Sequence, residues 1–312
     1  MLSHSAGQGK PVVACVVSAE GELPTGRSMA VPNYRFPEYC ADVLARAAER
    51  REWLSRPVGE PPRCDDLDPA AARRLIGSHL DRGQRDGAWL ASAEAEALLA
   101  THGLNVVPSH QCQTIDRAIA AAEQIGGPIA LKADLPPPAY AGEIDAVLLG
   151  LHGQAAISAG WEELERRVRR AGCPFIGAVL QRLMPPGVDV LVGTVIDPEF
   201  GRVMAVGVGG PTGGIAGTAA FRLPPATDLD AHELIDASEA VTSQLDGPRG
   251  LPPLDRDALR ELVLRFALLL REAPEIVEAD LNPVRCMNNG CAVLNMRLRI
   301  QHVAPSERIK TW

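Results

Sequence analysis

The sequence predicts a mixed α/β (α+β) fold, and three observations carry this prediction. Between residues 92 and 181, apolar strand-like segments alternate with helix patterns that a Ser or Thr precedes and a glycine ends. From residue 188 onward, strand and turn patterns become frequent, and Asn289-Gly290 is the strongest hairpin signal in the chain. The composition, 46% hydrophobic and 22% charged over 312 residues, is typical of a globular protein.

Charge, hydropathy and cysteine usage exclude several classes of protein. The net charge of -8 argues against nucleic acid as the main partner, although a local basic site for an anionic small molecule remains compatible with it. The apolar run LVLRFALLL is nine residues long and contains Arg265, whereas a membrane span needs about 18. Seven cysteines without a CxxC pair predict reduced thiols, so we expect a cytoplasmic protein. Because no apolar run is long enough for a span, we expect no membrane partner.

The first 130 residues contain most of the helix signals. We expect strands at 11–17 and 31–36 and a helix at 38–55, a set too small to bury a core alone. Further helices are predicted at 69–82, at 92–102 with Ser92 as its cap, and at 115–125 with Thr114 as its cap. A buried strand, Ile129–Leu131, then ends at Lys132.

The remainder alternates between strands and helices. The predicted strands are 146–151, 175–181, 188–196, 203–208, 219–223, 275–281, 283–287 and 291–298. The predicted helices are 161–170, 228–245 and 255–271. The hairpin at Asn289-Gly290 joins the last two of these strands.

Two features suggest phosphate binding. Lys132 ends an apolar strand, so its ammonium group faces either an anion or solvent, because a buried unpaired charge is costly. The glycine-rich run GVGGPTGGIAG at 207–217 is followed by a predicted strand, which argues against a dinucleotide fingerprint, since that motif requires a helix. The run is either a loop whose amides cover phosphates or a plain loop.

The segment ExDxN predicts a metal site. Glu278, Asp280 and Asn282 lie two residues apart on a predicted strand and therefore point to the same side. Mg²⁺ with nucleotide phosphates favours such oxygen ligands. The alternative is a solvated strand face, against which the apolar neighbours of these residues argue.

Taken in order, the lysine, the glycine loop and the acidic strand resemble the two-lobed ATP-grasp fold. The resemblance extends to the NDP-forming acyl-CoA synthetases, which include ADP-forming acetate–CoA ligase and the related succinyl-CoA synthetase. It spans residues 88–300 and rests on SAEAEALLATHGL, GGPIALKAD, VLQRLMPPGVDVLVG, DPEFG, VGVGG, AAFRLPP and EADLNP. The first sixty residues resemble the end of the flavodoxin-like CoA-ligase domain of fused members.

The resemblance implies a division of the chain and a set of site residues. The expected parts are a flavodoxin-like remnant (1–60), a linker with a helix (61–87), the ATP-grasp domain (88–302) and a tail (303–312). The implied ATP-binding residues are Lys132, Gln181, Met184, Asp189, Gly209 and Gly210. The implied Mg²⁺ ligands are Glu278, Asp280, Asn282 and Asn295.

The chain departs from the family pattern at several of these places. Tyr140 occupies the position of the family's phosphate-relaying histidine, and a phenol with a pKa near 10 is a poor substitute. Gly214 and Thr218 replace a Glu and an Asp after the glycine loop. Asn295 replaces a metal-binding aspartate, which keeps an oxygen ligand and removes a charge.

Three hypotheses about function follow from the resemblance. The first is the ATP-binding, β-type part of an acid–CoA ligase, acting with a separate CoA-binding α-type chain or as a homo-oligomer. The second is a catalytically degenerate ATP-grasp module that binds nucleotide for regulation or scaffolds a partner such as an acetyltransferase. The third is a truncated product without function. The replaced histidine favours the second for chemistry, and Lys132 with ExDxN favours nucleotide binding.

Overall fold

The computed structural model of the chain divides it into two compact units, residues 1–58 and 59–312. Each unit is described by itself. The residues that the structure describes are 10–15, 31–81, 87–136, 141–142, 144–210, 218–225, 227–247 and 253–303.

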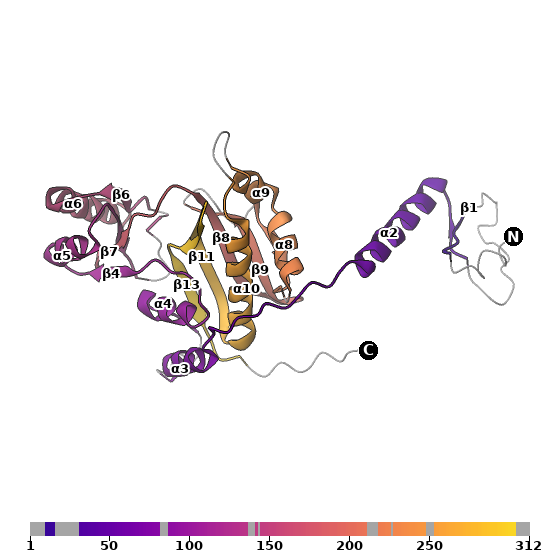
Figure 1. Cartoon of the computed structure of the whole chain (residues 1–312), viewed down its shortest axis with the longest axis horizontal. Coiled ribbons are helices and arrows are strands. Elements are labelled where there is room, and N and C mark those ends of the chain that lie inside the picture. Colours follow the sequence, from indigo (N-terminus) through magenta and orange to yellow (C-terminus); the bar gives the residue numbers. More distant parts are fainter. Residues whose placement is uncertain are drawn as a thin grey trace. The chain divides into compact units, whose positions relative to one another are not determined.

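The first unit contains few elements. Strands β1 (Ala14–Cys15) and β2 (Asn33–Tyr34) pair in parallel, and helix α2 (Pro37–Ser55) follows (Figure 1). The helix matches its predicted position, whereas the described strands are shorter than predicted, and residues 16–17 lie outside the described residues. None of the α2 side chains is buried, as expected of so small a set of elements.

A four-stranded antiparallel sheet forms the smaller layer of the second unit. Its order is β4-β7-β5-β6, from strands Ser109–Cys112, Gly177–Arg182, Ile129–Asp134 and Val147–Leu151. Helices α5 (Ile115–Ile125) and α6 (Gln154–Arg170) pack against it (Figure 1). As predicted, Thr114 caps α5, since its hydroxyl accepts from Arg117 N at 3.4 Å, and Gly126 ends it with φ +68°.

A seven-stranded sheet forms the larger layer. Its path is β10-β9-β8-β11-β13-β3, and β12 pairs with β11. The strands are Ala220–Arg222, Gly201–Val208, Val188–Asp197, Ile276–Met287, Met296–Ile300, Ala88–Trp89 and Gly290–Val293 (β12). All of its strand pairs are antiparallel.

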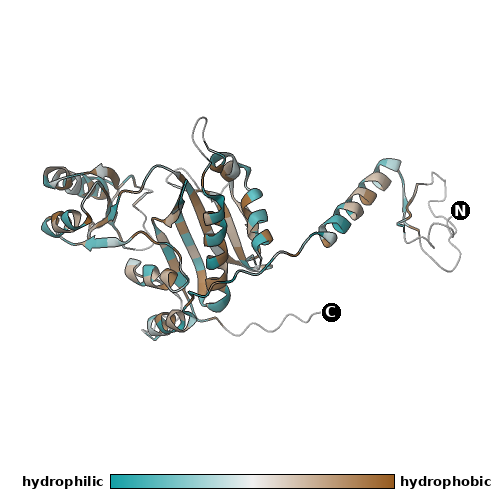
Figure 2. Ribbon diagram, viewed as in Figure 1, coloured by the Kyte–Doolittle hydropathy of each residue, from teal (hydrophilic) through white to brown (hydrophobic). Residues whose placement is uncertain are grey.

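Five helices accompany this sheet in the described part of the chain. They are α3 (Pro69–Leu80), α4 (Ser92–Ala100), α8 (Asp228–Asp236), α9 (Glu239–Leu245) and α10 (Arg256–Glu272). Helices α8, α9 and α10 lie on one face of the sheet (Figure 1). Their polar sides are visible in teal in Figure 2. Phe266, on the apolar side of α10, is completely buried. No described helix is both long and apolar enough to span a bilayer.

Two predicted helices differ in detail. The predicted helix 228–245 is two helices, because the backbone leaves helical geometry at Ser238 (φ -98°, ψ 90°). The hydroxyl of Ser238 donates to Thr218 O at 2.7 Å. The predicted cap Ser92 is the first helical residue of α4. The capping position belongs to Ala91, whose backbone N–H donates to Glu94 Oε2 at 3.2 Å.

The strands also show four corrections. The predicted strand 291–298 is two strands, β12 (Gly290–Val293) and β13 (Met296–Ile300). Strand β5 continues past Lys132 to Asp134, so the lysine lies within the strand and not at its end. The predicted strands 275–281 and 283–287 are one strand, β11, whose pairing with β8 shifts register between Leu281 and Val284. The hairpin is confirmed, but Met287 pairs with Gly290, so its two-residue loop lies one position earlier than predicted.

Candidate functional site

A cavity of about 260 Å³ lies where the two sheets meet. The four-stranded sheet contributes Lys132, Asp134 and Gln181, and helix α4 contributes Ser92 and Glu96. Ser109 and Arg182 of the four-stranded sheet also line the cavity, and Asp189, Arg285, Asn295 and Arg297 come from the larger sheet and the segments beside it. Its size is close to the lower end of the range of small-molecule sites, roughly 300–1,000 Å³.

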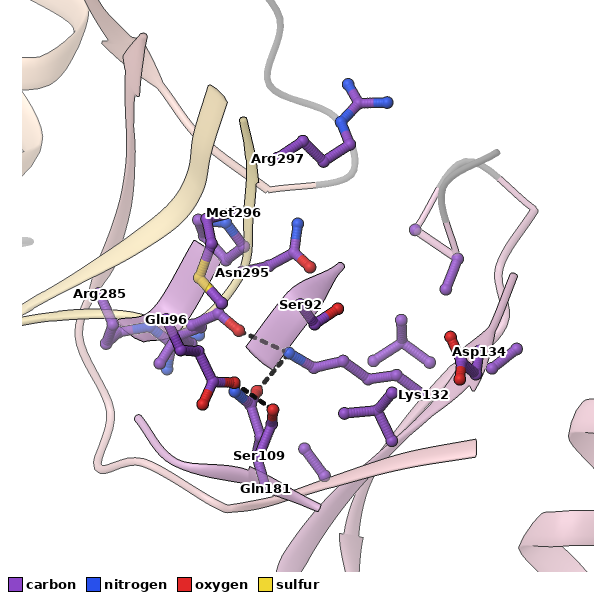
Figure 3. Close-up of a pocket in the computed structure, with 18 of the residues that line it drawn as sticks. Ser92, Glu96, Ser109, Lys132, Asp134, Gln181, Arg285, Asn295, Met296 and Arg297 are labelled. Carbon is purple, nitrogen blue, oxygen red and sulfur yellow. Dashed lines mark hydrogen bonds between the residues drawn. The ribbon is translucent and has the colours of Figure 1, made fainter. Parts of the chain in front are cut away.

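Lys132 bridges the two sheets inside this cavity. Its Nζ donates to Gln181 Oε1 and, at 2.8 Å, to the backbone O of Leu294 (Figure 3). Burial lowers the pKa of Lys132 to about 8, and the carboxylates of Asp189 and Glu96 oppose that shift. Both hydrogen-bond acceptors are neutral, so neither neutralises the charge of the ammonium group. An anion that bound beside it would supply the missing negative charge.

Gln181 fixes the position of the lysine. Its side chain is buried on β7, where Nε2 donates to Val107 O at 2.9 Å, and this leaves Oε1 directed at Lys132. Met184, from the segment after β7, also lines the cavity. The structure therefore brings Gln181 and Met184, two of the implied ATP-binding residues, to the same cavity as Lys132.

Asp189 is paired with an arginine that the sequence motifs do not indicate. Asp189 on β8 and Arg285 on β11 are directly opposite in the sheet. Arg285 Nε donates to Asp189 Oδ1 at 2.5 Å, and its Nη2 donates to Oδ2 at 3.2 Å. A two-point contact of this kind fixes both side chains in the cavity wall.

The predicted phosphate-loop glycines lie outside the lining of the cavity. The amide of Gly209 donates to Asp189 O at 2.8 Å, and the amide of Gly210 donates to Asn282 Oδ1 at 2.8 Å. Both amides therefore stabilise the protein's own strands. The rest of the predicted loop, 211–217, lies outside the described residues and includes Gly214.

Gly209 is expected to be required for close packing of the backbone. A Cβ atom there would lie 2.6 Å from the carbonyl carbon of Val190, so Gly209→Ala should destabilise the protein by about 1–3 kcal/mol in urea unfolding. Gly127→Ala is the matched control, because a Cβ atom at that position would meet nothing within 4 Å. Its free energy of unfolding should change by less than about 0.5 kcal/mol. Equal values for the two variants would contradict this interpretation.

The predicted metal ligands are paired with other groups. Glu278 faces Arg299, with 3.8 Å between Oε2 and Nη1, and Asp280 faces Arg297, with 3.3 Å between Oδ2 and Nη2. Asn295 Nδ2 donates to the backbone O of Asn282 at 3.1 Å.

Of the four predicted ligands only Asn295 lines the cavity. Across the described ranges no three His, Cys, Asp or Glu side chains form a cluster able to hold a metal ion. In the arrangement described, these residues do not fit a Mg²⁺ site, because both carboxylates already face a guanidinium group.

Several charged or hydroxyl-bearing residues of the cavity wall were not predicted from the sequence as site residues: Ser92, Glu96, Ser109, Asp134, Arg182, Arg285 and Arg297. Glu96 accepts a hydrogen bond from Ser109 Oγ, and burial raises the pKa of Asp134. Asp134 was within reach of prediction, since it lies two positions after Lys132 on one strand and faces the same side. Tyr140 lies outside the described residues.

Comparison with known proteins identifies the family. A model of the ATP-grasp domain matches residues 82–300. The chain belongs to the ATP-grasp family. Among relatives of this ATP-grasp chain, an ADP-forming acetate–CoA ligase I of Archaeoglobus fulgidus is 29% identical over 295 residues, covering 93% of this chain and 42% of the relative. An ADP-forming acetate–CoA ligase II β subunit of Pyrococcus furiosus is 30% identical over 210 residues, covering 66% and 89%.

Solved structures agree with the ATP-grasp assignment. An acetyl-coenzyme A synthetase 1 of Ca. Korarchaeum cryptofilum, in complex with coenzyme A and Ca-AMPCP, superposes with a TM-score of 0.64 at 26% identity. The match covers 74% of this chain and all of the compared chain. The predicted fold class is therefore confirmed. This ATP-grasp chain spans less than half of the Archaeoglobus ligase and most of the Pyrococcus β subunit.

Proposed function

We propose that this chain is the ATP-binding, β-type part of an NDP-forming acid–CoA ligase, acting with a separate CoA-binding chain or as a homo-oligomer. The observation that carries the proposal is Lys132, a lysine at the junction of two sheets whose two hydrogen-bond acceptors among the described residues are both neutral. The relatives named as acetate–CoA ligases support the reaction class. A cytoplasmic location remains a prediction. The Mg²⁺ ion expected from the resemblance is not part of this proposal, because the two carboxylates predicted to bind it face guanidinium groups.

The residues of the cavity have distinct roles in this proposal. Lys132 compensates phosphate charge, and Gln181 holds its ammonium group in position. Asp189, fixed by Arg285, offers carboxylate oxygens that can accept hydrogen bonds from ribose hydroxyls. ATP is the proposed nucleotide because structures of the Korarchaeum relative contain the ATP analogue Mg-AMPPCP or the ADP analogue Ca-AMPCP.

Nucleotide binding is tested by isothermal titration and thermal unfolding with ATP. At 100 times the Kd, ATP should stabilise the protein by about 2.7 kcal/mol. Lys132→Met should weaken binding about 10–100-fold, the usual effect of losing a charge-assisted hydrogen bond. Lys10→Met is the matched control, because Lys10 is exposed in the other unit. No binding by the wild type, or unchanged binding by Lys132→Met, would refute the assigned site.

Labelled ATP distinguishes a ligase part from a non-catalytic module. The protein is incubated with γ-labelled ATP, an acid and CoA, together with a CoA-binding partner chain. Phosphoryl transfer or acyl-CoA formation supports the ligase part. ATP binding without either product supports the degenerate module that Tyr140 suggests.

A further inference from the structure

We propose that Arg297, and not a divalent cation, supplies the second positive charge for the nucleotide phosphates, so that the chain binds ATP as the metal-free anion. The inference rests on the proposed nucleotide site and specifies which form of the nucleotide the site takes. Arg297 lies on β13 and lines the same cavity as Lys132. In Figure 3 its guanidinium group lies on the far side of Asn295 from Lys132.

Among the described residues, Asp280 and Trp89 contact the guanidinium group of Arg297. Nη2 lies 3.3 Å from Asp280 Oδ2, and the Cζ atom lies 5.6 Å from the centre of the Trp89 ring. Contact with an aromatic ring and a carboxylate orders an arginine side chain before a ligand arrives. Arginine also matches phosphate geometry better than other cations of the protein. The cavity therefore contains an ordered anion-binding group besides Lys132.

The two carboxylates of β11 face arginines of the neighbouring strand β13. The register of β11 and β13 places Asp280 directly opposite Arg297 and Glu278 directly opposite Arg299. Arg297 lines the cavity, whereas Asp280 does not. A phosphate in the cavity thus meets the guanidinium group, and a metal ion at Asp280 would have to displace it or accept repulsion from it.

The two asparagines among the predicted metal ligands, Asn282 and Asn295, do not supply the negative charge that a cation needs. Asn282 Oδ1 accepts from the Gly210 amide at 2.8 Å, and the Asn282 backbone O accepts from Asn295 Nδ2. Both asparagine side chains are neutral, so they add no negative charge for a cation. Mg²⁺ in nucleotide sites is usually bound through one or two carboxylates together with the phosphates.

The other carboxylates of the cavity are separate from this strand. Asp189 is paired with Arg285, and Glu96 accepts from Ser109. Asp134 lies on β5 in the opposite sheet, where burial raises the pKa of its carboxyl group. A metal ion bound at Asp134 instead would make nucleotide binding depend on Mg²⁺, and a titration with and without the metal detects that dependence.

The test is titration of the purified full chain with ATP, once with excess EDTA and once with excess Mg²⁺. The proposal predicts a Kd in EDTA equal to or lower than the Kd in Mg²⁺. Binding only in Mg²⁺ would overturn the proposal and leave the proposed nucleotide site intact. Absence of binding in both conditions would refute the nucleotide site itself, and the inference with it.

Variants of Arg297 and Arg299, both on β13, then test whether Arg297 is responsible for ATP binding in EDTA. Arg297→Gln should weaken binding in EDTA at least about tenfold, and Arg297→Lys should restore part of the loss. Arg299→Gln is the matched control, because Arg299 also faces a carboxylate but does not line the cavity, and its Kd should stay within about twofold. Melting temperatures check that each variant is folded. Wild-type affinity in a folded Arg297→Gln protein would overturn the proposal.

Discussion

Between pH 8 and pH 10.5, the wild-type protein is expected to gain about 3 kcal/mol of stability relative to Lys132→Met. Burial lowers the pKa of Lys132 from the ordinary value of 10.5 to about 8. Below pH 8 the lysine is protonated in both the folded and the unfolded state, so the cost of burying the charge is constant. Between the two values the unfolded state binds more protons, so the free energy of unfolding rises with pH.

The magnitude follows from the two pKa values. A difference of one pH unit corresponds to about 1.36 kcal/mol, which gives roughly 3 kcal/mol as an upper value for this partly buried group. Urea unfolding of both proteins at several pH values measures the difference. Comparing wild type with Lys132→Met cancels the titration of other groups, and Lys10→Met, which removes an exposed lysine of the other unit, controls for the loss of one positive charge.

The small number of lysines permits a direct measurement. The sequence contains only Lys10, Lys132 and Lys310. Reductive methylation with ¹³C-formaldehyde should therefore give three lysine resonances, of which one titrates near pH 8 and disappears in Lys132→Met. A Lys132 resonance that does not titrate near pH 8 would contradict the environment described for this lysine. Addition of ATP should move the low value upward, because phosphate favours the charged form.

Replacement of Gln181 by Met is expected to destabilise the protein by about 2–4 kcal/mol. Gln181 is only 3% exposed, and its amide satisfies two groups, Lys132 Nζ and Val107 O. Methionine has a similar volume but makes neither hydrogen bond, and each buried unsatisfied group costs about 1–3 kcal/mol, more for a charged one. Urea unfolding at pH 7 measures the loss.

The substitution Gln181→Met should also lower the pKa of Lys132. Without Gln181 Oε1, the charged form of Lys132 loses an acceptor, so the pKa of Lys132 should fall below about 8. Gln111→Met is the matched control, since Gln111 lies on the neighbouring strand β4 with its side chain exposed. A free energy of unfolding for Gln181→Met within about 0.5 kcal/mol of wild type would show that the amide contributes little.

Local sequence patterns predicted most elements correctly. The Thr before α5 and the glycine after it were sufficient to predict where this helix begins and ends. Capping residues satisfy backbone groups only a few positions away, so the signal is local. The hairpin of β11 and β12 follows for the same reason, although its turn shifted by one residue. The helix break at Ser238 was not predictable locally, since its hydroxyl bonds to Thr218, 20 positions away.

Within the site, the sequence alone determined the residue types, and the tertiary structure decided their partners. Lys132 and the Glu278–Asn282 strand were identifiable because a charge in an apolar strand and a two-residue spacing are local properties. The pairing of Asp280 with Arg297, and of Asp189 with Arg285, depends on the register between strands distant in the chain. Register is set by packing of the whole sheet, so only the folded structure shows that the carboxylates of β11 face arginines of β13.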